Sequence, residues 1–323
     1  MRQNITIFVS ESGTAAARTF ACKILAEGEV KAENILNPIE SQEVREIAAQ
    51  YVSLFEHGCR AQARDYLPIL SAGLFRLFFE KSWKEIEPIA SDGADLTVAS
   101  KIPEVLLLPW ELVRFPSPVG AALGFDERFS ILRLPQDTDR PSVFSAKIPS
   151  GPLRVLFMAC EPLDFEQEER WMVQAAEGID LLLQVGEKGS LQELQILAAA
   201  FRPQVVHLAG EVKTKNGQPF FSFEGEGGRP DLKSSEELAA ALAECGVQCI
   251  VLSGCQRSAS SSLDIFCQRL AKRHFLAVAW NATSDMISPF YRAVSSGKTV
   301  DEALGALRRE WQKACWEHGS FFA

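Results

Sequence analysis

The sequence lacks the features that mark several large classes of protein. Its 323 residues carry a net charge of −9, so there is no excess of Lys and Arg for the phosphate contacts of a nucleic-acid surface. The apolar runs are far too short to span a membrane, and the first of them, Ile5–Ser10, is too short for a signal peptide. The eight cysteines do not make a disulfide framework in a chain of this length. We therefore expect a cytoplasmic protein with no nucleic-acid and no membrane partner.

Motifs for metal and nucleotide binding are also missing. The spacing of the cysteines in the last third does not fit paired-cysteine zinc knuckles: Cys245, Cys249 and Cys255. Ser296-Gly-Lys-Thr299 resembles the end of a phosphate-binding loop, but Arg292 stands where that motif needs its first Gly. Thr299 and Glu302 fit a helix capping box better. We expect no metal and no cofactor. A nucleotide-binding signalling protein is the least favoured hypothesis for the function.

The second half of the chain has a regular rhythm. Short apolar segments predict buried strands at Leu153–Ala159, Ile179–Val185, Gln204–Ala209, Gln248–Ser253 and Phe275–Trp280. Segments with helical periodicity separate them or close the chain, at Glu166–Ala176, Leu191–Phe201, Ser234–Cys245, Leu263–Lys272, Ser284–Ser295 and Val300–Gln312. Strands that alternate with helices of this length indicate right-handed βαβ units and a mostly parallel sheet.

The first half is less regular. Strands are expected at Ile5–Ser10, Asp95–Ala99, Val105–Leu108 and Phe129–Leu134, and helices at Thr14–Glu27, Ser41–Phe55 and Ala61–Phe79. Asp137–Gly151 is rich in Pro, Ser and charged residues and is the best candidate for a boundary. We divide the chain into residues 1–150 and 151–323.

Two predicted strand ends in the second half carry the residues from which a function can be argued. Parallel sheets bind ligands in a crevice at the carboxyl ends of their strands. There Gly254 and Cys255 follow Gln248–Ser253, and Glu211 follows Gln204–Ala209. A thiolate attacks carbonyl carbon when a base activates it, and a Gly beside it lets backbone amides approach an oxyanion. Cys255 is thus a candidate nucleophile, with a buried structural thiol as the alternative.

The base that such a cysteine needs is in question. His207 is the only histidine in a predicted strand of this half, but it lies roughly 13 Å below Glu211 at ~3.3 Å per residue. Its alternative role is that of a hydrogen-bonded core histidine. Glu211 is a weaker base than imidazole, and its charge raises the pKa of a nearby thiol. The alternative for Glu211 is a solvent-facing turn residue, or an ion pair with Lys213 or Arg257.

The ordered set of segments resembles the CHAT family, in the caspase-like and separase-like clan of cysteine peptidases. In the first half the resemblance rests on Leu108-Pro-Trp-Glu-Leu112 and Phe129-Ser-Ile-Leu-Arg133. In the second half it rests on Val205-Val-His-Leu-Ala-Gly210, Ile250-Val-Leu-Ser-Gly-Cys255, Ala277-Val-Ala-Trp280 with Asp285, Phe290-Tyr291 and residues 297–303. It implies an α/β caspase-like three-layer sandwich with a central mostly parallel sheet, extended by an N-terminal α/β subdomain.

The resemblance also assigns roles to single residues. Cys255 keeps the nucleophile position and Gly254 the oxyanion region, whereas the family's His-Gly pair is replaced by Glu211-Val212. His207 corresponds to a common non-catalytic histidine of the same strand. Asp285 and Trp280 are the candidates for substrate binding, although Asp285 is also well placed to cap a helix.

The leading hypothesis is a pseudopeptidase that binds a protein or peptide partner in the old substrate crevice. Without a base, the thiol stays mostly protonated near neutral pH and the leaving amine has no acid. By resemblance, such a module serves bacterial signalling or defence, as part of a larger chain or complex. The alternative is an active cysteine endopeptidase in which Cys255 attacks and His207, or a histidine from a partner chain, is the base.

Overall fold

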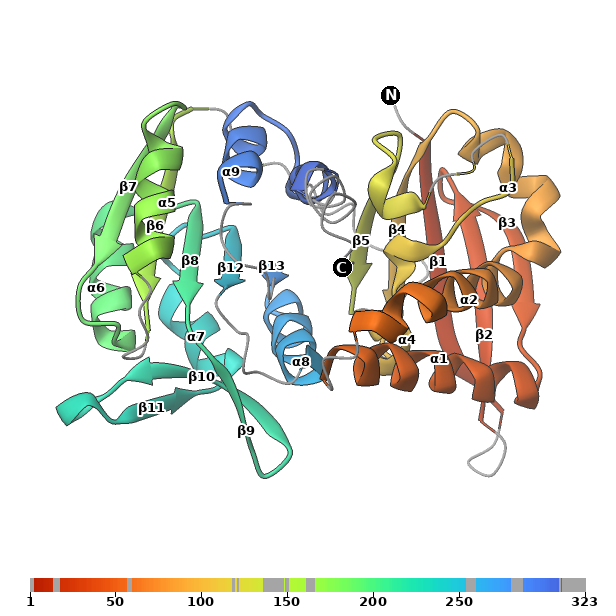
Figure 1. Ribbon diagram of the computed structural model, residues 1–323, viewed down its shortest axis with the longest axis horizontal. Coiled ribbons are helices and arrows are strands. Elements are labelled where there is room, and N and C mark those ends of the chain that lie inside the picture. The colour runs from red at the N-terminus through yellow and green to blue at the C-terminus, as the bar shows by residue number, and fades with distance from the viewer. Residues whose placement is uncertain are drawn as a thin grey trace. The chain divides into compact units, whose positions relative to one another are not determined.

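The computed structural model describes residues 3–13, 18–56, 60–117, 120, 122–135, 148, 151–160, 166–253, 260–279, 287–307 and 309. The chain forms two compact units, each with its own sheet (Figure 1). Unit 1 comprises Met1–Phe144 with Leu304–Ala323, and unit 2 comprises Ser145–Ala303.

The centre of unit 2 is a parallel five-stranded sheet in the order β13-β12-β8-β6-β7. Its strands are β6 (Leu153–Ala159), β7 (Leu181–Gly186), β8 (Val205–Ala209), β12 (Cys249–Ser253) and β13 (Leu276–Ala279). Every residue of β8 and β12 is buried, as expected for central strands that helices cover on both faces. The predicted parallel sheet is therefore confirmed, and β6 has the predicted bounds.

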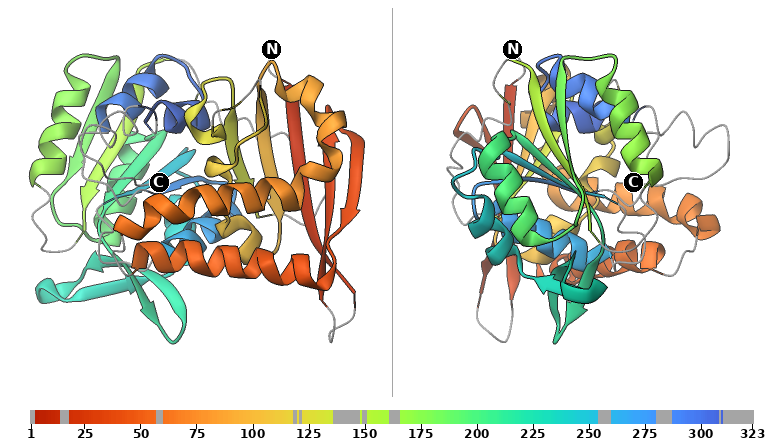
Figure 2. Two further views of the ribbon diagram at one scale, coloured as in Figure 1. Left: turned by 45° about the vertical axis from the view of Figure 1, so that its right-hand side comes forward. Right: turned by 90° about the vertical axis from the view of Figure 1, so that its left-hand side faces the viewer.

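Helices cover both faces of this sheet and complete a three-layer sandwich. The face with Leu156, Leu208 and Ile250 packs against α6 (Leu191–Phe201), α7 (Ser235–Leu242) and α8 (Ser260–Ala271). The opposite face, which includes His207, bonds to α5 (Glu166–Ala176) and α9 (Ile287–Ser295). Figure 2 shows α5 and α6 on opposite sides of the strands. The expected caspase-like α/β architecture is thus present.

A small antiparallel sheet follows β8 directly along the chain. It has the order β11-β10-β9, with β9 (Val212–Lys215), β10 (Gln218–Glu224) and β11 (Pro230–Lys233). A short helical turn, η4 (Glu226–Gly228), joins the last two strands. Phe221 and Phe223 of β10 are buried and pack into the same core as α8, so this sheet is anchored to the α6–α8 layer.

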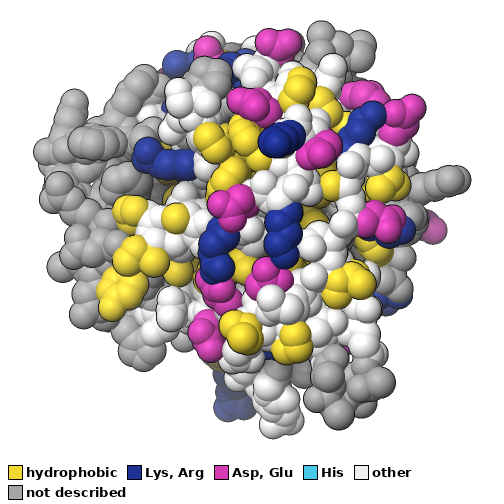
Figure 3. Space-filling view, turned by 90° about the vertical axis from the view of Figure 1, so that its right-hand side faces the viewer, with side chains coloured by type: hydrophobic (Ala, Val, Ile, Leu, Met, Phe, Trp, Pro, Cys, Tyr) yellow, Lys and Arg dark blue, Asp and Glu magenta, His cyan; other side chains and the backbone are white. Residues whose placement is uncertain are grey.

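Unit 1 is built on a mixed sheet in the order β3-β2-β1-β4-β5. Its strands are β1 (Gln3–Ser12), β2 (Thr19–Ala26), β3 (Glu29–Ile35), β4 (Ala94–Ser100) and β5 (Ser130–Leu134). The first three are antiparallel, and β1, β4 and β5 are parallel. Lys23 of β2 pairs with Glu33 of the edge strand β3, where Lys31 pairs with Glu29. Figure 3 shows such opposite charges side by side, which discourages edge-to-edge pairing.

Helices cover the face of this sheet that carries Ile5, Ile7 and Val9. They are α1 (Pro38–Glu56), α2 (Arg60–Phe78), the turn η1 (Glu80–Ser82), α3 (Trp83–Ala90) and α4 (Pro103–Leu107). Two further turns, η2 (Trp110–Leu112) and η3 (Leu123–Phe125), lead to β5. Trp110 is fully buried, packs on Phe78 at 4.8 Å between ring centroids, and donates its indole N–H to the Val105 carbonyl at 2.9 Å.

Two expectations for the first half are wrong. Thr14–Glu27 was expected as a helix, but the described part contains β2, because Phe20, Cys22 and Ile24 are buried at the alternate positions of a strand. Val105–Leu108 was expected as a strand but contributes to α4, which Pro103 begins. The helix expected at Ser41–Phe55 is present as α1, which begins three residues earlier, at Pro38.

Two smaller expectations are confirmed. Residues 300–307 are helical, and the preceding Thr299 forms the predicted capping box with Glu302, through backbone-to-side-chain bonds of 3.0 and 3.4 Å.

In the part of the chain that the structure describes, no helix is both long and apolar enough to cross a membrane.

Candidate functional site

The carboxyl edge of the unit 2 sheet is the place where a ligand crevice is expected. The strand order changes direction at β6, whose neighbours β7 and β8 lie on either side of it. In open α/β sheets, ligands bind outside the carboxyl ends of the strands at such a switch point. Ala159, Ala209 and Ser253 end β6, β8 and β12 at this edge, side by side in register.

The structure describes two of the six residues that the sequence suggested for the site. Glu211 follows β8 at the carboxyl edge, and His207 lies within β8. The other four lie outside the described residues: Gly254, Cys255, Trp280 and Asp285. The site can therefore be built from the strand ends and from the side chains that pack beneath them.

Gly210 holds the strand ends together before the chain turns into β9. Its N–H bonds to the Ser253 carbonyl at 3.0 Å, and the Cys160 N–H bonds to the Ala209 carbonyl at 2.7 Å. A Cβ at Gly210 would lie 2.7 Å from Cζ of Phe221 and 3.0 Å from the Cys160 carbonyl oxygen. Only a residue without a side chain fits here, and this close approach brings the next residue, Glu211, into the protein.

Glu211 is buried, with a side chain only 10% exposed. Its Oε2 lies 3.8 Å from Nζ of Lys213, and its backbone carbonyl accepts the Ser222 N–H at 2.9 Å. The expectation of a solvent-facing turn residue is therefore wrong, because β10 packs over this position. The expected ion pair with Lys213 is confirmed, and Arg257 lies outside the described residues.

His207 is fully buried at the centre of a polar cluster, which comprises His207, Glu168, Ser253 and Tyr291. Its Nδ1 lies 2.8 Å from the Tyr291 hydroxyl. Its Nε2 lies 2.7 Å from Oγ of Ser253 and 3.0 Å from Oε1 of Glu168. Ser253 also donates its hydroxyl to Glu168. The cluster thus joins β8 to α5, β12 and α9.

The hydrogen-bond directions follow from the number of protons in the cluster. Ser253 has one hydroxyl proton, which it donates to Glu168, so towards His207 its oxygen acts as the acceptor. Nε2 of His207 therefore carries a proton. Burial raises the pKa of Tyr291 well above its ordinary value, so its hydroxyl stays protonated and can donate to Nδ1 of His207.

This arrangement has a direct chemical consequence for His207. A general base needs a ring nitrogen with an available lone pair near the proton that it removes. In the neutral ring, the Nδ1 lone pair accepts from Tyr291 and the Nε2–H points to Ser253 and Glu168. Phe157 packs edge-on against the ring, 5.4 Å between centroids. The geometry is that of the hydrogen-bonded core histidine that the sequence offered as the alternative.

The sequence analysis did not identify Glu168, Ser253 and Tyr291 as partners of His207. They lie 39, 46 and 84 residues from it along the chain. Tyr291 gives the clearest signal in retrospect, because it is a tyrosine on an otherwise apolar helix face that must bury its hydroxyl. Among the residues that the structure describes, no group of three His, Cys, Asp or Glu side chains could hold a metal ion.

A protein-family model matches most of this chain. The family model for the CHAT domain matches residues 74–319, which takes in the last five residues of α2 and everything from there to the last described residue. The match therefore covers most of the chain and the whole sheet of unit 2. No curated protein sequence matches the chain.

Proposed function

This chain belongs to the CHAT domain family, a caspase-like family related to peptidases, and we propose that it is a pseudopeptidase member. In this proposal it keeps the peptidase fold, with Cys255 at the nucleophile position and Gly254 in the oxyanion region, but lacks the general base. It binds a protein or peptide partner at the carboxyl edge of the unit 2 sheet and acts as a regulatory module.

The observation that carries this proposal is the side chain at the end of β8. By resemblance a histidine belongs there, and this chain has Glu211, buried and paired with Lys213. A carboxylate whose charge is engaged by a lysine is a poor base, and its charge raises the pKa of a thiol nearby. Without an imidazole at position 211, that side chain catalyses neither deprotonation of the thiol nor protonation of a leaving amine.

The histidines in the described part of the chain offer no substitute. His207 is enclosed by Tyr291, Ser253 and Glu168, and both of its ring nitrogens take part in that cluster. His274 precedes β13 and therefore lies at the amino edge of the sheet, opposite the crevice. These positions favour the pseudopeptidase over an endopeptidase in which His207 acts as the base.

The proposed ligand is a peptide segment of another protein. A crevice built for a peptide substrate keeps its shape after the chemistry is lost, because the strand ends and helices that form it also form the core. Asp285 and Trp280 are the residues that we assign to ligand contact. The setting that we infer, a bacterial signalling or defence system, rests on resemblance to the family alone.

The first experiment measures the rate at which iodoacetamide alkylates Cys255 as a function of pH, by peptide mass spectrometry, with Cys255→Ala as the blank. We expect a rate that rises only around pH 8–9, as for an unactivated thiol. Two other cysteines supply an internal reference, because burial raises the pKa of Cys22 and Cys249 to about 12. A plateau well below pH 8 would mean an activated thiolate and would overturn the proposal.

A gain-of-function pair sharpens this experiment. Glu211→His together with Val212→Gly restores the family's pair, and Glu211→Gln removes the charge without adding a base. We expect alkylation in the His-Gly variant to reach its plateau at lower pH, because an adjacent imidazolium favours the thiolate. The Gln variant should move the profile only slightly to lower pH, because it removes the charge of Glu211 without adding a base. A plateau at low pH in both variants would show that a base other than residue 211 activates Cys255.

A further inference from the structure

A groove of about 550 Å³ lies between α1 and α2 in unit 1, on a different unit from the proposed crevice. The helices lie close together at Gly73, where an added Cβ would lie only 3.1 Å from Cδ1 of Ile47. The residues that line the groove are Pro38, Ile39, Gln42, Glu43, Glu46, Ile47, Gln50, Ile69, Leu70 and Gly73. Its edges are apolar and open to solvent, since Ile39 is 79% and Ile69 is 65% exposed.

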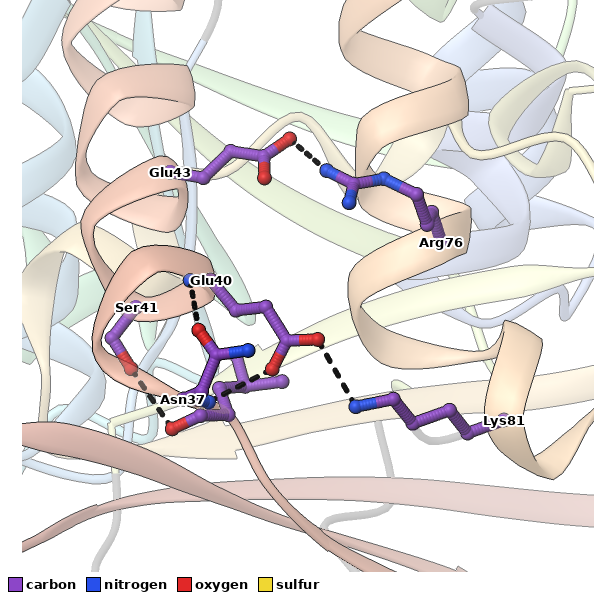
Figure 4. Close-up of polar contacts among 7 residues, drawn as sticks. Asn37, Glu40, Ser41, Glu43, Arg76 and Lys81 are labelled. Carbon is purple, nitrogen blue, oxygen red and sulfur yellow. Dashed lines mark hydrogen bonds and ion pairs between the residues drawn. The ribbon is translucent and has the colours of Figure 1, made fainter.

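Polar contacts hold the two walls of the groove in place. Figure 4 shows Glu43 of α1 bonded to Arg76 of α2, and Glu40 bonded to Lys81 of η1 at 3.0 Å. Asn37 accepts the Glu40 N–H at 2.9 Å and donates its own N–H to that carboxylate at 2.8 Å, which caps α1. The hydrogen bond from the Asn37 N–H lowers the pKa of Glu40, and Lys81, which lies outside the groove, lowers it to a smaller extent. The groove is therefore formed before any ligand arrives.

The charge of the groove is acidic. The described residues that line it include two carboxylates, Glu43 and Glu46, and neither Lys nor Arg. Glu43 is balanced by Arg76, whereas Glu46 is exposed and accepts a hydrogen bond from the neutral Gln42 at 3.1 Å. A ligand that covers the apolar edges must therefore face a negative charge at Glu46, and a cationic side chain is its complement.

The walls also decide the conformation of the ligand. An extended peptide gains its affinity from backbone bonds to a strand edge, but two helices use their backbone groups internally and offer only side chains. A helix satisfies its own backbone and can present apolar residues at i, i+3 or i+4, and i+7. The lining residues of α1 run from Pro38 to Gln50, which spans about 18 Å at ~1.5 Å per residue. That length fits roughly three turns of helix.

We propose that the α1–α2 groove binds an amphipathic helix of a partner protein whose apolar face is flanked by Lys or Arg. A second copy of this chain fits less well, because the described helices outside α1 and α2 that expose a large apolar side chain do not present a cationic face. Ile196 lies on α6, which contains no Lys or Arg. Val173 lies on α5, where three Glu outnumber the single Arg170, which pairs with Glu166. This proposal does not depend on the fate of Cys255.

The test uses two synthetic peptides of about 14 residues. Both have Leu at the same positions, at helical spacing. All remaining positions are Lys in one peptide and Glu in the other. Fluorescence anisotropy at low salt measures their binding to the full chain. We expect the Lys peptide to bind about tenfold more tightly than the Glu peptide. Equal binding of the two peptides would overturn the proposal.

Matched variants locate the binding. Ile69→Glu should abolish binding of the Lys peptide, whereas Ile196→Glu, at an isoleucine that is 61% exposed on unit 2, should leave it unchanged. Glu46→Lys should weaken the Lys peptide and strengthen the Glu peptide, each about fivefold. All three positions are exposed, and circular dichroism checks that each variant folds. An equal loss of Lys-peptide binding in Ile69→Glu and Ile196→Glu would exclude a partner helix in this groove. So would self-association of the chain, if Ile69→Glu removes it.

Discussion

Arg133 gives a physical reason for the sequence signature in the first half of the chain. Its guanidinium bonds to both carboxylate oxygens of Glu111, and it also donates to the carbonyls of Leu106 at 2.9 Å and Leu108 at 3.0 Å. The Glu111 side chain is only 8% exposed. Close packing enforces the pairing, because a Cβ at Gly124 would lie 2.5 Å from that of Glu111. The two first-half segments that carry the family resemblance thus meet at the planar guanidinium of Arg133, which forms four hydrogen bonds.

Arg133→Lys should destabilise unit 1 although the charge is kept. A lysine cannot form the two-pronged contact with Glu111 or reach both carbonyls at once. We expect a loss of about 1–3 kcal/mol in the free energy of unfolding, as for a buried polar group that loses its partner. Urea denaturation measures it. Arg170→Lys is the matched control, since its 3.7 Å pair with Glu166 is exposed and should contribute almost nothing.

At the same scale, the candidate site was only partly predictable. The sequence indicates that Glu211 follows a strand, because the apolar run before it is short and ends in Gly. It could not indicate that Glu211 is buried, because the cover comes from Phe221 and β10, whose packing depends on the antiparallel pairing of β9 with β10. The partners of His207 were unpredictable for the same reason, since α5, β12 and α9 meet only in the folded unit.

At the scale of elements, the hydrogen bond between Tyr291 and His207 attaches α9 to the sheet of unit 2. Tyr291→Phe removes the hydroxyl from Nδ1 of His207 while it keeps the buried ring and its stacking. We expect a loss of about 1–3 kcal/mol in the free energy of unfolding, because the imidazole loses a bond that water cannot replace. Tyr66→Phe, on a side chain that is 46% exposed, is the control and should change little. Equal effects would mean that the hydroxyl of Tyr291 adds nothing beyond its ring.

The elements of the second half were the easiest to predict. β6, α5 and α6 have the predicted bounds because central strands and amphipathic helices differ in both length and periodicity. The errors in the first half have a different cause. The sequence of β2 predicts a helix because Ala, Lys and Leu favour helices, but pairing with β1 and β3 overrides that preference. α4 is only Pro103–Leu107, too short for helical periodicity to be seen.

For the whole molecule, each unit contains a buried thiol that links its stability to pH. Burial raises the pKa of Cys22 in unit 1 and of Cys249 in unit 2 from 9.0 to about 12. In the unfolded chain these thiols ionise near their ordinary pKa, whereas in the folded chain they stay protonated. Between the two values the unfolded state has fewer bound protons, so stability falls as pH rises. The contribution is complete below about pH 9 and is lost as pH approaches about 12.

At alkaline pH, the effect of pH on the stability of each unit should therefore be measurable separately. Each thiol contributes a loss of about 1.4 kcal/mol per pH unit in this window, because one proton is released on unfolding. Cys22→Ala should flatten the pH dependence of unit 1 alone, and Cys249→Ala that of unit 2 alone. Both replacements also leave a small cavity, but its cost does not depend on pH and leaves the slope unaffected. Urea unfolding under reducing conditions, followed by hydrogen exchange in each unit, measures the slopes. A pH dependence that neither replacement changes would mean that both thiols ionise in the folded chain as readily as in the unfolded one.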